Sequence, residues 1–531
     1  MSKEIKRTSP IGDAIAKSIM SIDSLKDSSL IFISSIDNEV KNARDEFKQE
    51  AEPFKTVVSI EEVEEEEKKR IVFDIPASHR RKIIEKHNRL KRMVHAQSII
   101  PRNFLIAYVS EFDYFVGAVL RAIYKLKPEL LNTSDRVFNF KDLCKFNSLE
   151  DVREEVIEKD IEQILRSSHT DQFKTIAAKV DIETLTQFNN WPKFIEITER
   201  RNLFVHTDGV ISTQYQKVCG NVKITIKDDQ IGQKLDCSIE YLNQTYEIMY
   251  EVIVKLGQTL WRKLFGKSLE QKILADEYLI HTLFELLCVE QYGLVINLGE
   301  FALQQRNLSN DFNKRMMIIN LCLAYKYSNN KSKLEELLNK HDWSAIPDVF
   351  QLAIACINDE HEISCELIKK LIQHNSDLLT EGSLHSWPLF RVLKEQECFK
   401  KMYLELFKTS FNKVSIIEEP DLQEDISYAN LEVEVIEVDE ISDQVIPDTT
   451  TDQSNLNDGD KDANLEIIEI EKNSDQVIPD TIIGQSNPND GDKHANLEVS
   501  EIKRVADQEV TDNITTQLNS DDSNDISSLS K

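Results

Sequence analysis

Apolar side chains recur at helical spacing through most of the chain before residue 410. After Pro101, for example, large apolar residues follow one another three and four positions apart, which places them on one face of an α-helix. The run 222–226 instead alternates apolar and polar positions and predicts a short strand or hairpin arm. The chain is therefore predicted to be all-α, with helices that include residues 149–167, 182–188, 191–206 and 239–265.

Changes in pattern and charge divide the chain into five parts. They are a helical N-terminal lead (1–70), a basic helical segment (71–99), a mostly helical domain (100–265), a region of short helices (268–410) and a tail (418–531). In the fourth part, small residues stand between large apolar ones, a pattern typical of closely packed antiparallel helix pairs in an α-solenoid. This region resembles a tetratricopeptide-like array, although no fixed repeat length is present.

The formal net charge of −29 is concentrated at one end of the chain. Residues 418–531 hold 31 acidic and 6 basic side chains and one aromatic residue, whereas the rest of the chain is close to neutral. Such a composition buries too little apolar surface to offset the entropy of ordering, so this tail is predicted to be disordered. Within it Ser442–Thr449 recurs 32 residues later as Ser474–Thr481. The repeated segment is interpreted as a spacer, with a docking motif as the alternative.

Several classes of protein are disfavoured by what the chain lacks. No stretch reaches the roughly 18 consecutive apolar residues of a membrane span, and the N-terminal residues show no secretion signal. The eight cysteines form neither a CxxC pair nor a metal-type spacing with histidine. We therefore expect a cytoplasmic protein with buried thiols, no membrane contact, no bound metal and no cofactor.

Residues 79–95 are strongly basic, with seven Lys or Arg residues and one Glu. The stretch fits an exposed helix face, and it also fits a surface that binds the phosphates of RNA. The sequence does not separate these two interpretations. On the second one, the RNA-binding candidates are Arg80, Arg81, Lys82, Arg89, Lys91 and Arg92.

Arg201 and His206 form the most informative motif, with Asn202 directly after the arginine. They lie in the predicted helix 191–206, and Gly209 follows as a stop signal. RNA carries its own nucleophile, the 2′-hydroxyl, so its cleavage needs chiefly proton transfer and charge stabilisation. Histidine titrates near neutral pH and transfers protons, while a guanidinium stabilises the charge that grows on a phosphate. Asn202 shares a helix face with His206, where its amide can orient the imidazole or bind phosphate.

Arg201 and His206 do not share a face of an ideal helix. Their spacing of five residues corresponds to a rotation of about 140° between the two side chains. They meet at one site only if the arginine wraps around the helix, if the helix distorts near its end, or if a second subunit contributes one of them. The last option makes dimerisation part of the mechanism.

The segment Arg201–His206 resembles the R-x4-6-H motif of HEPN domains, and Tyr108–Gly117 resembles the first helix of the RiboL-PSP type of this family. The resemblance covers residues 100–265. It implies a helical bundle that forms homodimers with both motifs in a shared cleft. Many members of this family are metal-independent endoribonucleases, often toxins or antiviral effectors. The resemblance therefore implies the same activity here, with single-stranded RNA or tRNA as candidate substrate. Carried over to this chain, the catalytic pair and its supporting residue are Arg201, His206 and Asn202. Further possible site residues are Arg200, Asp113 and Glu111.

Other interpretations stay open. Arg201 also fits an ordinary ion pair with Glu196 or Glu199, and a histidine at a helix C-terminus is favourable through the helix dipole alone. At the level of function, a catalytically inactive HEPN dimer would act as an adaptor that binds a protein partner through residues 268–410. Nucleic-acid binding without cleavage is a third and weaker alternative.

Overall fold

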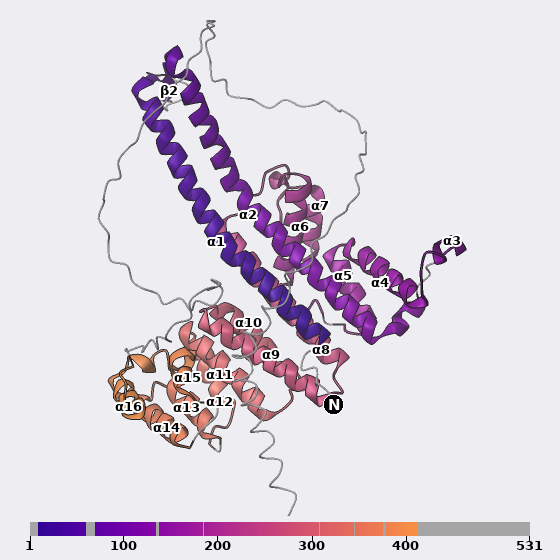
Figure 1. Cartoon of the computed structure of the whole chain (residues 1–531), viewed down its shortest axis with the longest axis vertical. Coiled ribbons are helices and arrows are strands. Elements are labelled where there is room, and N and C mark those ends of the chain that lie inside the picture. Colours follow the sequence, from indigo (N-terminus) through magenta and orange to yellow (C-terminus); the bar gives the residue numbers. More distant parts are fainter. Residues whose placement is uncertain are drawn as a thin grey trace, which may run out of the picture. The chain divides into compact units, whose positions relative to one another are not determined.

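The computed structural model describes residues 9–59, 69–133, 137–183, 185–306, 308–344, 346–374 and 379–411. This part of the chain is all-α, as predicted, apart from a two-stranded antiparallel sheet (Figure 1). The predicted tail, 418–531, lies outside the described residues. The strands are β1 (Lys55–Ser59) and β2 (Lys69–Phe73). The helices are α1 (Pro10–Ala51), α2 (Ala77–Leu126), α3 (Phe140–Leu143), α4 (Leu149–Leu165), α5 (His169–Val180), α6 (Trp191–His206), α7 (Thr213–Asn221), α8 (Ile239–Leu264), α9 (Leu269–Cys288), α10 (Tyr292–Leu303), α11 (Asp311–Tyr327), α12 (Lys331–Asn339), α13 (Asp348–Ile357), α14 (His361–Gln373), α15 (Glu381–Ser386) and α16 (Glu397–Phe407).

The two longest helices, α1 and α2, lie antiparallel and side by side as a hairpin (Figure 1). Ion pairs hold them together, because Glu46 of α1 contacts both Lys86 and Arg89 of α2 at 2.8 Å. At one end of the hairpin β1 pairs with β2, in the register that sets Lys55 opposite Phe73. Acidic side chains on α1 therefore neutralise part of the basic stretch on α2.

The core of the helical bundle lies where α1, α2 and α8 meet. Ile11, Ile15 and Ile22 of α1 are buried in the same core as the apolar face of α2. Gly257 of α8 permits this close packing, because a Cβ at that position would lie 2.4 Å from Cγ1 of Ile15. The predicted N-terminal lead and the predicted domain 100–265 thus share one core.

Helix α2 is continuous over 50 residues. It contains the whole basic stretch 79–95 and runs on through Pro101, so the boundary predicted between residues 99 and 100 falls inside a helix. Of the described helices, α2 alone is long and apolar enough to cross a membrane by length and composition. Half of its most apolar window is buried inside the protein.

Two predicted elements are wrong. The described residues of 182–188 form turns and bends, and the helix in this part of the chain is α5, which already ends at Val180. Residues 222–226 form no strand, and their apolar residues Ile224 and Ile226 pack against a small apolar cluster beside α7. The alternation of apolar and polar positions there reflects a loop with one covered side.

Helices α9 to α16 form the predicted region of short helices. Helix α10 packs against α9 and α11, and α13 packs against α14. Gly299 lets α10 and α11 come close, because a Cβ there would lie 3.1 Å from the Leu321 side chain. An ion pair of 2.6 Å between Arg262 of α8 and the fully buried Asp276 of α9 connects this region to the bundle.

Candidate functional site

Helix α6, which carries the R-x4-H motif, has the predicted bounds. Pro192 lies in its first turn, where a missing backbone N–H leaves no hydrogen bond unmade. After the helix, Gly209 adopts a φ of 85°, and a Cβ there would lie 2.9 Å from the carbonyl oxygen of Leu235. Only glycine fits this turn without strain, so the chain ends the helix at His206 and turns back.

Arg201 points from α6 toward α2, where its Nη2 donates a hydrogen bond of 3.1 Å to Oδ2 of Asp113. The second carboxylate oxygen of Asp113, Oδ1, lies 3.1 Å from Nε2 of His169. His169 is the first residue of α5, and its side chain is only 5% exposed. Three helices thus meet in one chain of polar contacts, which consists of Arg201, Asp113 and His169.

His169 is absent from the candidates that the sequence pointed to. It lies in α5, whose buried apolar residues Phe173, Ile176 and Val180 follow helical spacing. A usable signal is present, because Ser168 caps the helix by accepting a hydrogen bond from the N–H of Asp171. A serine followed three residues later by an acidic residue is a helix-start signature, and it marks His169 as a first-turn residue.

The other acidic and amide candidates lie at the edge of these contacts or away from them. Burial raises the pKa of Glu199 above its ordinary value, and the Nδ2 of Asn202 lies 3.5 Å from Oε1 of this glutamate. No contact of Asn202 with His206 is present within the described chain. The Tyr114 hydroxyl and, to a smaller extent, the charge of Glu111 raise the pKa of Lys17 of α1, and no hydrogen bond or ion pair joins Glu111 to Arg201 among the described residues.

Arg200 belongs to a different, buried network. Its Nε donates to Oε1 of Glu196 at 2.8 Å, and its guanidinium lies 3.8 Å from the centre of the Tyr241 ring. The hydroxyls of Tyr215 and Tyr241 donate to the two oxygens of the same carboxylate, and Nη1 of Arg200 donates to the carbonyl oxygen of Asp236. These contacts join α6 to α7 and α8, so they determine where α6 presents Arg201.

Replacing Glu196 with alanine is expected to lower the free energy of unfolding by about 3 kcal/mol. The substitution leaves the Arg200 guanidinium, 16% exposed, without its counter-charge and removes the acceptor of two tyrosine hydroxyls. Urea denaturation followed by circular dichroism measures the change. Glu199→Ala on the same helix is the control, and we expect no loss of stability from it because burial already disfavours the charged form of Glu199. Equal urea midpoints for Glu196→Ala and the wild type would contradict this account.

His206 is exposed at the end of α6, and within the described chain it makes no contact with Arg201. Helix α6 is regular up to this residue, so no distortion brings the two side chains together. Arg201 does not wrap toward His206 either, because Asp113 holds it on the other side. Neither a wrapped arginine nor a distorted helix end therefore brings Arg201 and His206 together, which leaves a second subunit as the way to join them.

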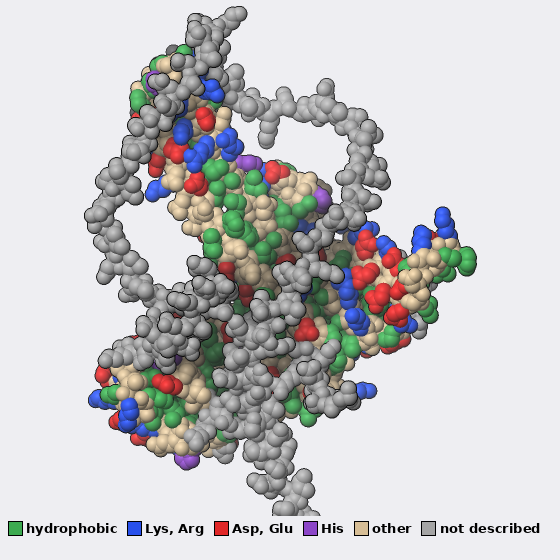
Figure 2. Space-filling model, viewed as in Figure 1, with side chains coloured by type: hydrophobic (Ala, Val, Ile, Leu, Met, Phe, Trp, Pro, Cys, Tyr) green, Lys and Arg blue, Asp and Glu red, His purple; other side chains and the backbone are tan. Residues whose placement is uncertain are grey.

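The basic candidates on α2 fall into two groups. Lys82 and Arg89 are bound by acidic residues of α1, with Lys82 at 2.5 Å from Glu50 and Arg89 at 2.8 Å from Glu46. Arg80 is half-buried near the start of the helix. In the part of the chain that the structure describes, three candidates are exposed and form no ion pair, and these are Arg81, Lys91 and Arg92. Figure 2 shows the resulting mixture of basic and acidic side chains on the hairpin.

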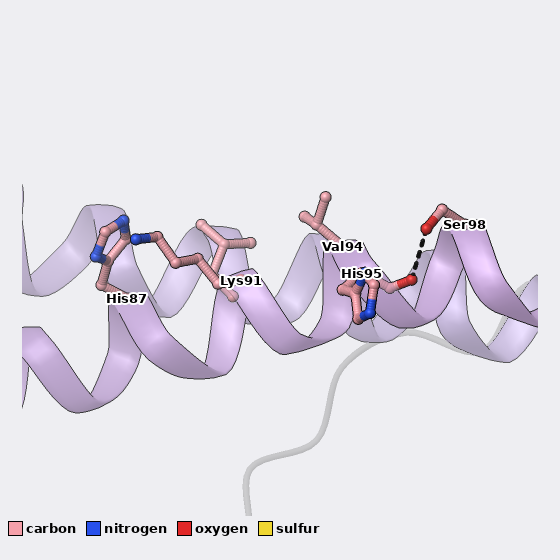
Figure 3. Close-up of a pocket in the computed structure, with 6 residues that line it drawn as sticks. His87, Lys91, Val94, His95 and Ser98 are labelled. Carbon is pink, nitrogen blue, oxygen red and sulfur yellow. Dashed lines mark hydrogen bonds between the residues drawn. The ribbon is translucent and has the colours of Figure 1, made fainter. Parts of the chain in front are cut away.

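An open hollow of about 490 Å³ lies along α2 and includes one of these unpaired cations, Lys91 (Figure 3). The residues that line it come from successive turns of this one helix and are His87, Leu90, Lys91, Val94, His95 and Ser98. Partial burial, and then the nearby charge of Lys91, lower the pKa of His87. The hollow therefore combines two imidazole rings, apolar side chains and a cation on one face.

Among the residues described, no group of three or more His, Cys, Asp or Glu side chains is arranged to hold a metal ion. The cysteines are mostly buried, as expected, but Cys144 and Cys288 are exposed.

No family model matches this chain, and no curated protein or solved structure matches it either. The resemblance to HEPN domains therefore rests on the chain's own residues, above all on the segment Arg201–His206.

Proposed function

We propose that this chain is a metal-independent endoribonuclease of the HEPN type that acts as a homodimer. A neutral His206 accepts the proton of an RNA 2′-hydroxyl, or its imidazolium form protonates the leaving 5′ oxygen. The 2′ oxygen attacks the adjacent phosphorus, the bond to the 5′ oxygen breaks, and a cyclic phosphate remains. Arg201 binds the phosphate and stabilises the charge that grows on it in the transition state.

The observation that best supports this role is the contrast between Arg201 and its neighbour Arg200. The Arg200 guanidinium donates hydrogen bonds to Glu196 and to the carbonyl oxygen of Asp236, and it stacks on the Tyr241 ring. Arg201 has one ion pair, to Asp113, and its buried Nε–H finds no acceptor among the described residues. With a single ion pair, through Nη2, and a side chain 23% exposed, the Arg201 guanidinium keeps donors that can bind a phosphate.

Exposed apolar side chains near His206 support a dimer. Val205, beside it, is 49% exposed, and Phe32 of α1 is 57% exposed. Phe32 packs on Phe104 of α2, and Phe204, which precedes Val205, lies against Arg102 of α2, so the segments that carry the two exposed residues flank the same part of α2. Covering apolar surface of this kind lowers the free energy, because it removes apolar side chains from water. In a symmetric dimer the two copies cover each other, and the His206 of one subunit then serves the Arg201 of the other.

The hollow on α2 supports single-stranded RNA as the bound partner. Unstacked bases pack on aromatic rings such as the exposed ring of His95, while phosphates pair with cations such as Lys91. His87 already packs on Phe47 of α1, at 5.3 Å between ring centres. A duplex would not expose its bases to the His95 ring. We place the activity in the cytoplasm, where RNA is abundant and where the resemblance to toxins and antiviral effectors would apply.

The test is cleavage of labelled single-stranded RNA and tRNA by the purified protein in EDTA. We expect the wild type to cut RNA and leave a cyclic phosphate, and we expect Arg201→Ala and His206→Ala each to lower the rate by at least about 100-fold. Arg166→Ala, which removes an exposed arginine paired within its own helix, is the matched control and retains the rate. Cleavage that survives both motif substitutions would refute the assignment. No cleavage by the wild type would favour the adaptor function instead.

A further inference from the structure

His169 is a buried polar residue for which the proposed reaction has no use. Its ring packs among aromatic side chains, 6.0 Å from the centre of Phe112 and 5.9 Å from the centre of Phe194, edge-on to the latter. Such surroundings leave the imidazole little freedom to rotate. The ring nitrogen Nε2 lies 3.1 Å from Oδ1 of Asp113.

The ion pair with Arg201 makes Asp113 the hydrogen-bond acceptor in this cluster. We therefore assign the proton of His169 to Nε2, which then donates to Oδ1 of Asp113. The second oxygen, Oδ2, accepts from Nη2 of Arg201 at 3.1 Å. With both oxygens engaged, the carboxylate has a fixed orientation, and one edge of the Arg201 guanidinium is fixed with it.

We propose that His169 is a positioning residue that acts through Asp113 to orient the Arg201 guanidinium. The inference rests on the proposed function for its catalytic consequence, while the positioning itself is independent of it. His169 stays buried and does not touch RNA. It restricts the rotation of the Asp113 carboxylate, and Asp113 in turn holds Nη2 of Arg201 so that the remaining donors face the substrate phosphate.

A second arginine–carboxylate pair in the described part of the bundle lacks a buried residue that orients its carboxylate. Arg121 of α2 also binds a carboxylate, Glu158 of α4, with Nε and Nη2 at 2.6 Å, but both side chains are nearly half exposed. No buried third residue orients that carboxylate among the contacts described. Arg121 therefore serves as an internal reference for an arginine in an ordinary surface ion pair.

The experiment compares two substitutions that differ in whether they keep a hydrogen-bond donor. His169→Phe keeps a ring in the aromatic pocket but removes the donor, whereas His169→Gln keeps a donor, its amide Nε2, near the position of the imidazole Nε2. The first readout is the rate at which phenylglyoxal modifies Arg201 in the intact protein, followed by mass spectrometry. We expect His169→Phe to raise this rate at least about threefold and His169→Gln to leave it near the wild-type value, with Arg121 unchanged in both.

The second readout is RNA cleavage. We expect kcat to fall about tenfold or more in His169→Phe and to recover in His169→Gln, because a misplaced arginine loses the geometry of the transition state. Asp113→Ala should reproduce the loss, and adding His169→Phe to it should change nothing further. His169→Leu repeats the test with a smaller apolar side chain in case the phenylalanine variant does not fold.

An unchanged Arg201 modification rate in a folded variant without the donor would overturn the positioning role. The failure of the proposed function looks different: the wild type would not cut RNA, yet the modification of Arg201 would still depend on residue 169. A loss of cleavage in both His169→Phe and His169→Gln, with no change at Arg201, would also overturn the inference, since it would show a purely structural role.

Discussion

A one-to-one mixture of Arg201→Ala and His206→Ala subunits is expected to recover about a quarter of the wild-type cleavage rate, although each variant alone is inactive. The reason is geometric. Arg201 faces Asp113 while His206 is exposed at the helix end, so each site needs one residue from each subunit. After exchange, half of the dimers are mixed, and each mixed dimer holds one intact site and one site that lacks both residues.

The control for this experiment places both substitutions on one chain and mixes it with the wild type. A mixed dimer then has two half-damaged sites, so the rate should fall to about a quarter of the wild-type value rather than to half. Subunit exchange is verified by pulling down one tagged variant with the other. Exchange without any recovered cleavage would show that Arg201 and His206 act within the same subunit.

Replacing Arg81, Lys91 and Arg92 by glutamine is expected to weaken the binding of single-stranded RNA by up to about 100-fold in 0.1 M salt, because three phosphate contacts are lost. The dependence of the logarithm of affinity on the logarithm of salt concentration should become shallower by about 2. Fluorescence anisotropy with a labelled RNA measures both quantities, and the His206→Ala background prevents cleavage during the titration.

The matched control removes three neighbouring charges that are already paired. Lys82, Lys86 and Arg89 contact Glu50, Glu46 and, for the arginine, also Glu39. Their replacement by glutamine changes the net charge by the same amount, but the salt dependence should stay as it is, since these cations do not contact phosphates. Equal effects of the two triple substitutions would mean that the hairpin acts only through its overall charge.

The parts of this structure that local chemistry determines follow from the sequence. The bounds of α6 are predicted correctly because Pro192 favours a helix start and Gly209 is required for the turn after it. The contacts of its side chains depend on residues far away in the chain. Arg201 binds Asp113, 88 positions earlier, where local reasoning had considered Glu196 or Glu199.

The same limit applies to the basic stretch. Its composition shows seven cations, but only the packing of α1 against α2 shows which of them are neutralised, since Glu46 is 40 positions before Lys86. Helix α5 carries two local signals, since Phe173, Ile176 and Val180 follow helical spacing and Ser168 caps its start. Neither signal shows that His169 contacts Asp113, 56 positions earlier. The role of His169 could therefore emerge only from the folded chain.

Because α2 is continuous, it fixes the separation between the hollow and the cluster around Arg201. Lys91, on the hollow, and Asp113, which holds Arg201, lie on the same uninterrupted helix, 22 residues or about 33 Å apart. On the proposed function, an RNA strand bound at the hollow would reach Arg201 only after spanning that length. Cleavage would then fall at a set distance from the bound part of the RNA, and shorter fragments would not be cut further.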